Sequence, residues 1–369
     1  MKGLPVIHRN PPASLARMAG MSLIELMIAI ALGLIVLAGL ATLFANQSAA
    51  RSEMERSSRQ IENGRFAMEL LGDELRVAGY YGELNLRAIT PPLAPAAALI
   101  DPCSFTPTDW VGAIPHHIQG YDNGAGAPGC LPADLRPNTD ILVVRRVSTC
   151  EAGTANCAPA ANGAPYIQVA RCNAQMIPTP SLGNAFEFGV RGTEPFARTG
   201  RNCAAAAGLR QYFVRIYYVA DVPAVVAPGG APVPDPVPVL KRLDLNAATG
   251  AWDQSVLADG IEQLQLEYGI DTDLDGDPDV YTANPTTYAC GGCTAGSNWA
   301  NTVTVRIHVL ARNVEPSVNY VDPKTYTLGR DAAGLALTVT PAGTLTGYRR
   351  HAYSGLVRLV NPSDRRDTP

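Results

Sequence analysis

"MSLIELMIAIALGLIVLAGLATLFA", residues 21–45, decides the architecture of this chain. From Leu26 to Ala45 it runs for twenty residues in which only Thr42 is polar. At about 1.5 Å of rise per residue, a helix of this length crosses the roughly 30 Å hydrocarbon core of a bilayer. Three cations and no acidic residue stand in the first twenty positions. The positive-inside rule therefore predicts a cytoplasmic N-terminus and an exported remainder.

One glutamate, Glu25, stands at the head of this apolar run. A carboxylate in a membrane segment costs about 2.5–3.5 kcal/mol unless an opposite charge meets it. A secretory signal peptide is the simpler interpretation, with Ser48-Ala49-Ala50 as the cleavage site and Arg51 as the first secreted residue. Such signals have an apolar run of only about 7–15 residues, and a disposable segment has no use for a costly carboxylate. We therefore expect a membrane helix in which Glu25 has a function.

The stretch "GMSLIELM", residues 20–27, resembles the class III signal of type IV prepilins and their pseudopilin relatives. The resemblance implies that a prepilin peptidase cuts after Gly20 and that the new terminus, Met21, is methylated. Most members of that family have phenylalanine where this chain has Met21. Glu25 becomes the fifth mature residue, and its implied role in assembly is to meet the terminal amine of a neighbouring subunit. Two charges 4 Å apart attract by about 4 kcal/mol at an effective dielectric of 20, which offsets the burial cost.

A helical pattern continues beyond the membrane run. Gly79 can adopt the left-handed conformation found just past helix ends, so we expect the helix to stop near Ala78. A solvent-exposed coiled coil is the alternative, but only about three heptads are present, which favours packing on a sheet. The pattern is an apolar stripe repeating every seven positions, at Met54, Ile61, Met68 and Leu75.

These features divide the chain into four parts. We expect a leader peptide over residues 1–20 and a transmembrane segment over residues 21–45. An amphipathic continuation of the helix follows over residues 46–79, and residues 80–369 form a periplasmic, β-rich globular domain. The expected fold class is α+β: a long N-terminal transmembrane and amphipathic helix packed on an antiparallel β-sheet, with long loops pinned by disulfides. This arrangement is also the pilin fold that the resemblance implies.

Strand signals begin after a loop-rich region. Residues 80–140 are rich in Pro, Gly and Ala and predict loops. Residues 303–309 alternate between apolar and polar side chains, as in an antiparallel sheet with one covered face. Residues 221–238 contain too many prolines for a strand and predict an extended, mobile loop between two strands. The strands are expected at residues 141–147, 166–170, 211–219, 239–245, 261–270, 303–311 and 356–360.

Eight cysteines lie on the exported side, where an even number indicates disulfides. Sequence leaves 105 connectivities open, and we expect neighbours to pair because this closes small loops. The Cys-Gly-Gly-Cys stretch allows a redox pair or half a zinc site instead, but no second CxxC accompanies it, which favours a structural disulfide. The expected pairs are Cys103 with Cys130, Cys150 with Cys157, Cys172 with Cys203, and Cys290 with Cys293.

Charge and motif content argue against two classes of function. Removing residues 1–20 leaves 26 basic and 33 acidic side chains, a formal charge of −7, which disfavours nucleic-acid binding. The sequence contains no HExxH, GxSxG or GxxxxGK motif, so nothing supports a hydrolase, a metalloprotease or an ATPase. We expect no enzymatic activity.

One acidic stretch, "IDTDLDGDPDVY" at residues 270–281, has aspartates at alternate positions around Gly276. Oxygen ligands at this spacing, with a glycine for the turn, are typical of a calcium loop. The bidentate glutamate expected at position 12 is replaced by Thr282, and the alternative is an acidic turn between strands. The candidate calcium ligands are Asp271, Asp273, Asp275, Asp277 and Asp279.

Two further stretches resemble PilW-type minor pilins: "ENGRFAMELLGDELRVAGYYG" (residues 62–82) and "YRRHAYSGLVRLVN" (residues 348–361). The resemblance implies a low-abundance subunit that helps to start pilus assembly and lies at the pilus tip. Its implied partners are minor and major pilins, prepilin peptidase, the inner-membrane assembly machinery and the lipid bilayer. It implies an inner-membrane location before assembly and a pilus location afterwards. Two alternatives stay open: a type II secretion pseudopilin, and a membrane-anchored calcium-dependent adhesin.

Overall fold

The computed structural model describes residues 22–223, 235–246, 249 and 251–364. It divides the chain into an N-terminal unit that ends at Met54 and a globular unit that begins at Glu55. One helix, α1 (Leu23–Arg76), supplies the described part of the N-terminal unit and enters the globular unit. Its apolar side chains up to Phe44 are exposed. The sequence boundaries at residues 20, 45 and 79 stay predictions.

Helix α1 ends at Arg76, two residues before the expected end at Ala78. A turn follows, and Gly79 has a φ of +70°, the left-handed conformation expected at this position. A Cβ on Gly79 would lie 2.9 Å from the Cβ of His117, so the close approach of the chain also requires glycine.

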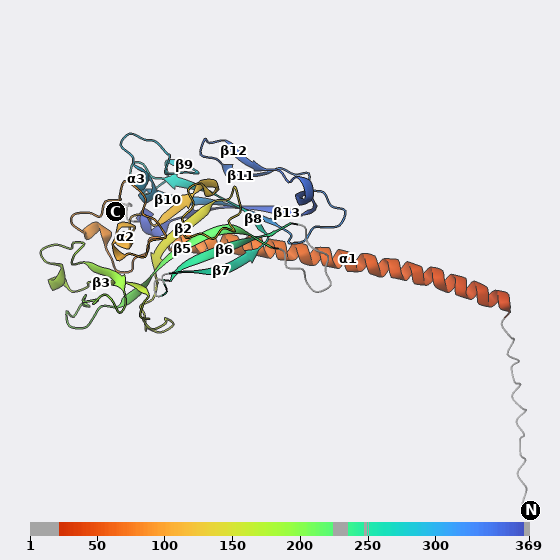
Figure 1. Ribbon diagram of the computed structural model, residues 1–369, viewed down its shortest axis with the longest axis horizontal. Helices are drawn as coiled ribbons and strands as arrows, with labels where there is room; N and C mark the ends of the chain where they lie inside the picture. Colours follow the sequence, from red (N-terminus) through yellow and green to blue (C-terminus); the bar gives the residue numbers. More distant parts are fainter. Residues whose placement is uncertain (1–21, 224–234, 247–248, 250, 365–369) are drawn as a thin grey trace, which may run out of the picture. The chain divides into compact units, whose positions relative to one another are not determined.

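The described residues of the globular unit form three antiparallel sheets (Figure 1). In the seven-stranded sheet, the order β1-β2-β5-β3-β4 carries a branch in which β6 pairs with β5 and β7 pairs with β6. These strands are β1 (Ile118–Tyr121), β2 (Ile141–Val147), β3 (Pro165–Val169), β4 (Phe186–Val190), β5 (Leu209–Val222), β6 (Val237–Asn246) and β7 (Ala251–Asp259).

The second sheet has four strands in the order β13-β10-β8-β9, and β11 and β12 form a separate hairpin. These strands are β8 (Ile261–Ile270), β9 (Val280–Thr282), β10 (Thr302–Arg312), β11 (Tyr326–Arg330), β12 (Ala336–Val339) and β13 (Arg350–Arg358). The short helices are α2 (Pro107–Gly112), α3 (Ala295–Ala300), α4 (Val360–Asp364), η1 (Leu86–Ala88), η2 (Asp122–Gly124), η3 (Asn173–Met176) and η4 (Gly343–Gly347). The α+β fold class with a long N-terminal helix and antiparallel sheets is confirmed.

The main core lies between α1 and both larger sheets. Ala67, Leu71 and Leu75 of α1 have no exposed surface and belong to one apolar cluster with residues of β2, β5, β8, β10 and β13. Gly64 lets the helix approach β13, because a Cβ there would lie 2.2 Å from the Tyr353 ring. A second core lies around α2, β2, β3, β4 and β5.

An ionic contact also fastens α1 to the seven-stranded sheet. The Glu74 carboxylate accepts two hydrogen bonds from Arg146 of β2, at 3.2 and 3.0 Å, and one from Arg215 of β5. Arg215 also bonds Asp244 of β6 at 2.9 Å. These side chains are only 13–24% exposed, so solvent screens the contact weakly.

The odd positions of residues 303–309 are fully buried, as the alternation predicts. The neighbouring strand β8 is covered on both faces, since all ten of its residues are buried. The reason is the β11–β12 hairpin, which covers the other face: a Cβ on Gly329 of β11 would lie 2.8 Å from His308 and 3.2 Å from Glu267.

The expected strands are present, with two corrections. The last strand begins at Arg350 rather than at residue 356, and Val360 belongs to α4. The expected loop over residues 221–238 is too long, because Asp221 and Val222 pair with Pro238 and Val237 in the β5–β6 ladder. Pro238 is tolerated near the start of β6, where its carbonyl still accepts a hydrogen bond from Gly260. Residues 224–234 of that loop lie outside the described residues.

Candidate functional site

The start of α1 is fixed by a reciprocal pair of hydrogen bonds. The Ser22 N–H donates to Oε2 of Glu25 at 2.9 Å, and the Glu25 N–H donates to Oγ of Ser22 at 3.3 Å. This capping box satisfies two of the N–H groups that a helix start leaves without partners. The Ser-x-x-Glu spacing at residues 22–25 is the sequence signal of this cap. Oε1 of Glu25 accepts no hydrogen bond from a described residue, so Glu25 can hold the cap and still receive a second donor.

Gly20 and Met21, the expected cleavage and methylation residues, lie outside the described residues. The structure therefore shows Glu25 at the start of α1 without the terminus that would meet it. The cleavage, the methylation and the assembly role of Glu25 stay predictions.

Four disulfides fasten the loops of the globular unit, and they join the cysteines that are neighbours in sequence. Their Cα atoms lie 4.9–6.1 Å apart, within the range that disulfides require. The pairs are Cys103–Cys130, Cys150–Cys157, Cys172–Cys203 and Cys290–Cys293.

The acidic loop brings together three of its five aspartates. Ligand oxygens of Asp271, Asp273 and Asp275 lie within 4.8 Å of one another. Asp271 is buried and accepts hydrogen bonds from the N–H groups of residues 274–276, whereas Asp279 accepts from Thr272. Asp277 lies outside the group of three, and the structure gives the loop its own internal hydrogen bonds. Calcium binding stays a prediction.

A histidine links three strands on the polar face of the four-stranded sheet. His308 contacts Oγ of Ser354 through Nδ1 at 2.8 Å and Oε2 of Glu267 through Nε2 at 3.1 Å. Gly329 closes over the imidazole ring. The network joins β8, β10 and β13 in register, and we interpret it as structural.

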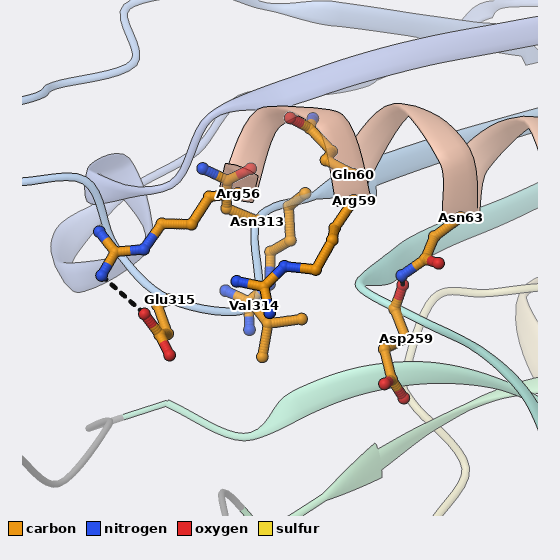
Figure 2. A pocket seen from close by; sticks show the side chains of 9 residues that line it. Arg56, Arg59, Gln60, Asn63, Asp259, Asn313, Val314 and Glu315 are labelled. Atoms are coloured by element: carbon orange, nitrogen blue, oxygen red, sulfur yellow. Dashed lines mark hydrogen bonds and ion pairs between the residues drawn. The ribbon is translucent and has the colours of Figure 1, made fainter. Parts of the chain in front are cut away.

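A polar pocket with a volume of about 160 Å³ lies in the globular unit, and we name it the arginine pocket (Figure 2). It is lined by Arg56, Arg59, Gln60 and Asn63 of α1, by Asp259 at the end of β7, and by residues 312–315. Among the contacts that fix it, Arg56 pairs with Glu315 at 2.7 Å, Gln60 donates to the Ala311 carbonyl at 2.9 Å, and Asn63 donates to the Asp259 carbonyl at 3.0 Å.

Arg312 also lines the arginine pocket and is only 1% exposed. Its Nη2 donates to the Pro236 carbonyl at 2.6 Å, and its guanidinium lies 4.0 Å from the centroid of the Tyr348 ring. Burial lowers the pKa of Arg312 from its usual range. No pattern in the sequence indicates this pocket, because its residues come from three distant segments and follow no motif.

Two family models match the chain. The prokaryotic N-terminal methylation motif matches residues 15–41, and the family described as Type IV Pilus-assembly protein W (PilW) matches residues 216–361. The two matches support a PilW-like type IV pilin. A comparison with curated proteins finds no match, and neither does a comparison with solved structures.

The matched residues include only one of the two stretches that resemble PilW-type minor pilins. The stretch at residues 348–361 lies inside the PilW match, but the stretch at residues 62–82 lies outside both matches. The PilW match begins inside β5 and includes the whole four-stranded sheet. Among the described residues, α1 is the one helix long and apolar enough to cross a membrane. The methylation motif and this helix fit a pilin that is anchored in the inner membrane before it enters the pilus, and the pilin and PilW families are structural proteins.

Proposed function

We propose that this protein is a minor pilin that helps to start type IV pilus assembly and joins the complex at the pilus tip. The observation that carries the proposal is the presence of two signals on one chain: a methylation motif that includes Glu25, and a PilW domain behind it. The methylation motif alone suits a type II secretion pseudopilin equally well. The PilW match favours the type IV pilus.

Processing after Gly20 is the first step of the proposal. The intact mass of the mature N-terminal peptide, measured from membranes with and without prepilin peptidase, tests it. We expect a peptide that begins at methylated Met21 and that depends on the peptidase. A start at Met1 would favour the anchored adhesin, and a start at Arg51 would indicate an ordinary secreted protein.

Assembly through the Glu25 carboxylate is the second step. We expect Glu25→Gln to abolish incorporation into pili and to leave membrane insertion intact, because the neutral side chain no longer attracts a terminal amine. Ser22→Ala is the matched control: it removes the hydroxyl of the capping box and keeps the carboxylate, so it should still assemble. Normal assembly of Glu25→Gln would contradict the proposal, as would equal loss of assembly in both variants.

A further inference from the structure

The arginine pocket contains guanidinium donors without a carboxylate of their own. Arg56 is paired with Glu315, but Arg59 has no ion pair or hydrogen bond to any residue that the structure describes. Figure 2 shows Arg59 extending from α1 toward Val314, away from the Asp259 carboxylate. The pocket therefore offers the N–H groups of Arg59 to a molecule that enters it.

Arg312 is a second and independent indication. Its Nε and Nη1 are buried and have no acceptor within the described parts of the chain. About 90% or more of buried polar groups in proteins are hydrogen-bonded, and an unpaired charged donor is the costliest exception. A donor pair of this kind points to an acceptor that is not among the described residues.

Glu262, the carboxylate whose charge acts on Arg312, already has partners of its own. Glu262 makes two hydrogen bonds to Arg350, at 2.5 and 3.0 Å, and lies 3.6 Å from Arg136. Asp322 also pairs with Arg350, at 3.3 Å. None of the described residues gives Arg312 an ion pair, so an entering anion would be its first.

We propose that the arginine pocket binds a carboxylate from an acidic side chain of a neighbouring subunit, with Arg59 and Arg312 as the donors. The proposal rests on the proposed function, because it needs an assembly that brings a neighbour to the pocket. A guanidinium presents parallel N–H groups that match the two oxygens of a carboxylate, and such charge-assisted bonds are among the strong ones in proteins.

The distance along the helix favours a protein carboxylate over a lipid phosphate. Arg56, the first pocket residue, lies eleven residues after Ala45, where the apolar run ends. Eleven helical residues measure about 16 Å, whereas the headgroup layer is only about 5–8 Å deep on each side. In the proposed assembly through Glu25, membrane helices would pack side by side, and acidic side chains of neighbouring subunits could then reach this level.

Binding of sodium acetate to the full-length protein tests the site. The protein is labelled with ¹⁵N-arginine and held in phosphatidylcholine nanodiscs, and the arginine Nε–Hε signals are followed at constant ionic strength against sodium chloride. We expect a saturable shift of the Arg59 and Arg312 signals, and acetate binding followed through the Arg312 signal should be at least tenfold weaker in Arg59→Gln. Arg65→Gln, an exposed arginine of the same helix outside the pocket, should bind acetate like the wild type. No saturable shift, or an unchanged shift in Arg59→Gln, would overturn the proposal.

Two further experiments complete the test. The first distinguishes a lipid anion from a protein carboxylate, and the second distinguishes failure of the anion site from failure of the proposed function. The same shift without acetate in phosphatidylglycerol nanodiscs would show that a lipid headgroup occupies the pocket. That result would overturn the proposal that a neighbouring subunit occupies it. In cells, we expect Arg59→Glu to lower incorporation into pili at least tenfold. Wild-type incorporation of that variant would overturn the docking role. If Glu25→Gln assembles normally while acetate binding still depends on Arg59, the proposed function fails and the anion site stands.

Discussion

Two segments of α1 have opposite surroundings. Between Leu23 and Phe44, the large apolar side chains are 49–79% exposed. Between Gln60 and Leu75, the residues that face the sheets are buried in the core of the globular unit. The first segment therefore completes its packing outside the chain, in lipid or in other subunits, and the second completes it within the chain. Substitutions in the first should change insertion or assembly, whereas substitutions in the second should change folding.

Tryptophan fluorescence can measure the effect on folding separately from the effect on insertion or assembly. The three tryptophans, Trp110, Trp252 and Trp299, all lie in the globular unit. Urea unfolding of the full-length protein in detergent, with the disulfides intact, thus reports the free energy of unfolding of that unit.

The largest effect is expected for Leu71→Ala. Leu71 has no exposed surface, and its loss leaves a cavity between α1 and the sheets. Substitutions of this kind cost about 2–5 kcal/mol, and we expect about 3–4 kcal/mol of the unfolding free energy. Leu34→Ala, in the exposed segment, should change it by less than about 0.5 kcal/mol. Equal effects in the two variants would refute the division of α1 into two segments.

A smaller effect is expected for Glu74→Gln, which leaves Arg146 and Arg215 without their carboxylate. Breaking a fully buried pair costs about 3–5 kcal/mol, and because Glu74 keeps some exposure we expect about 2–3 kcal/mol. Glu69→Gln, on the exposed face of α1, should cost less than about 0.5 kcal/mol.

The effect of Glu74→Gln should also depend on pH. Burial by itself would raise the pKa of Glu74, but the hydrogen bond from Arg146 and the charges of Arg215 and Arg146 outweigh it and hold the pKa below its usual 4.5. The contribution of the carboxylate is therefore complete above pH 4.5 and is lost as the pH falls through the lowered pKa. The difference between wild type and variant should shrink in acid, and a difference that grows in acid would contradict this sign.

Local patterns in the sequence predicted much of this fold. The seven-residue spacing matched the buried face of α1 only at its C-terminal end, because Leu75 is buried whereas Met54 and Ile61 of the same stripe are exposed. Apolar runs gave the bounds of β2 and β8. Strand β7 gave no such signal, because it carries polar residues such as Asp253 and Gln254 and is held by backbone pairing with β6. A strand of this kind can be identified only from its pairing with a neighbouring strand in the folded structure.

The candidate sites divide in the same way. Glu25 was found because its cost in an apolar run can be read directly from the sequence. Arg312 could not be found, because its burial depends on Tyr348, on Pro236 and on the end of its own strand. No spacing in the sequence shows that a guanidinium will lack a carboxylate after folding. The site at the N-terminus was therefore open to prediction, and the arginine pocket was not.

The smallest effect, and the most specific, is expected at Gly64. Alanine favours a helix over glycine by about 1 kcal/mol, but its Cβ at this position would lie 2.2 Å from the Tyr353 ring. The ring is partly exposed and can move, so we expect Gly64→Ala to cost only about 1 kcal/mol in total. In a Tyr353→Ala background the clash is absent, and the same substitution should stabilise the globular unit by about 1 kcal/mol. Gly39→Ala, which has nothing within 4 Å, should leave the unit unchanged. If Gly64→Ala changed the free energy of unfolding in the same direction in both backgrounds, the contact with Tyr353 of β13 would not be the reason for glycine at this position.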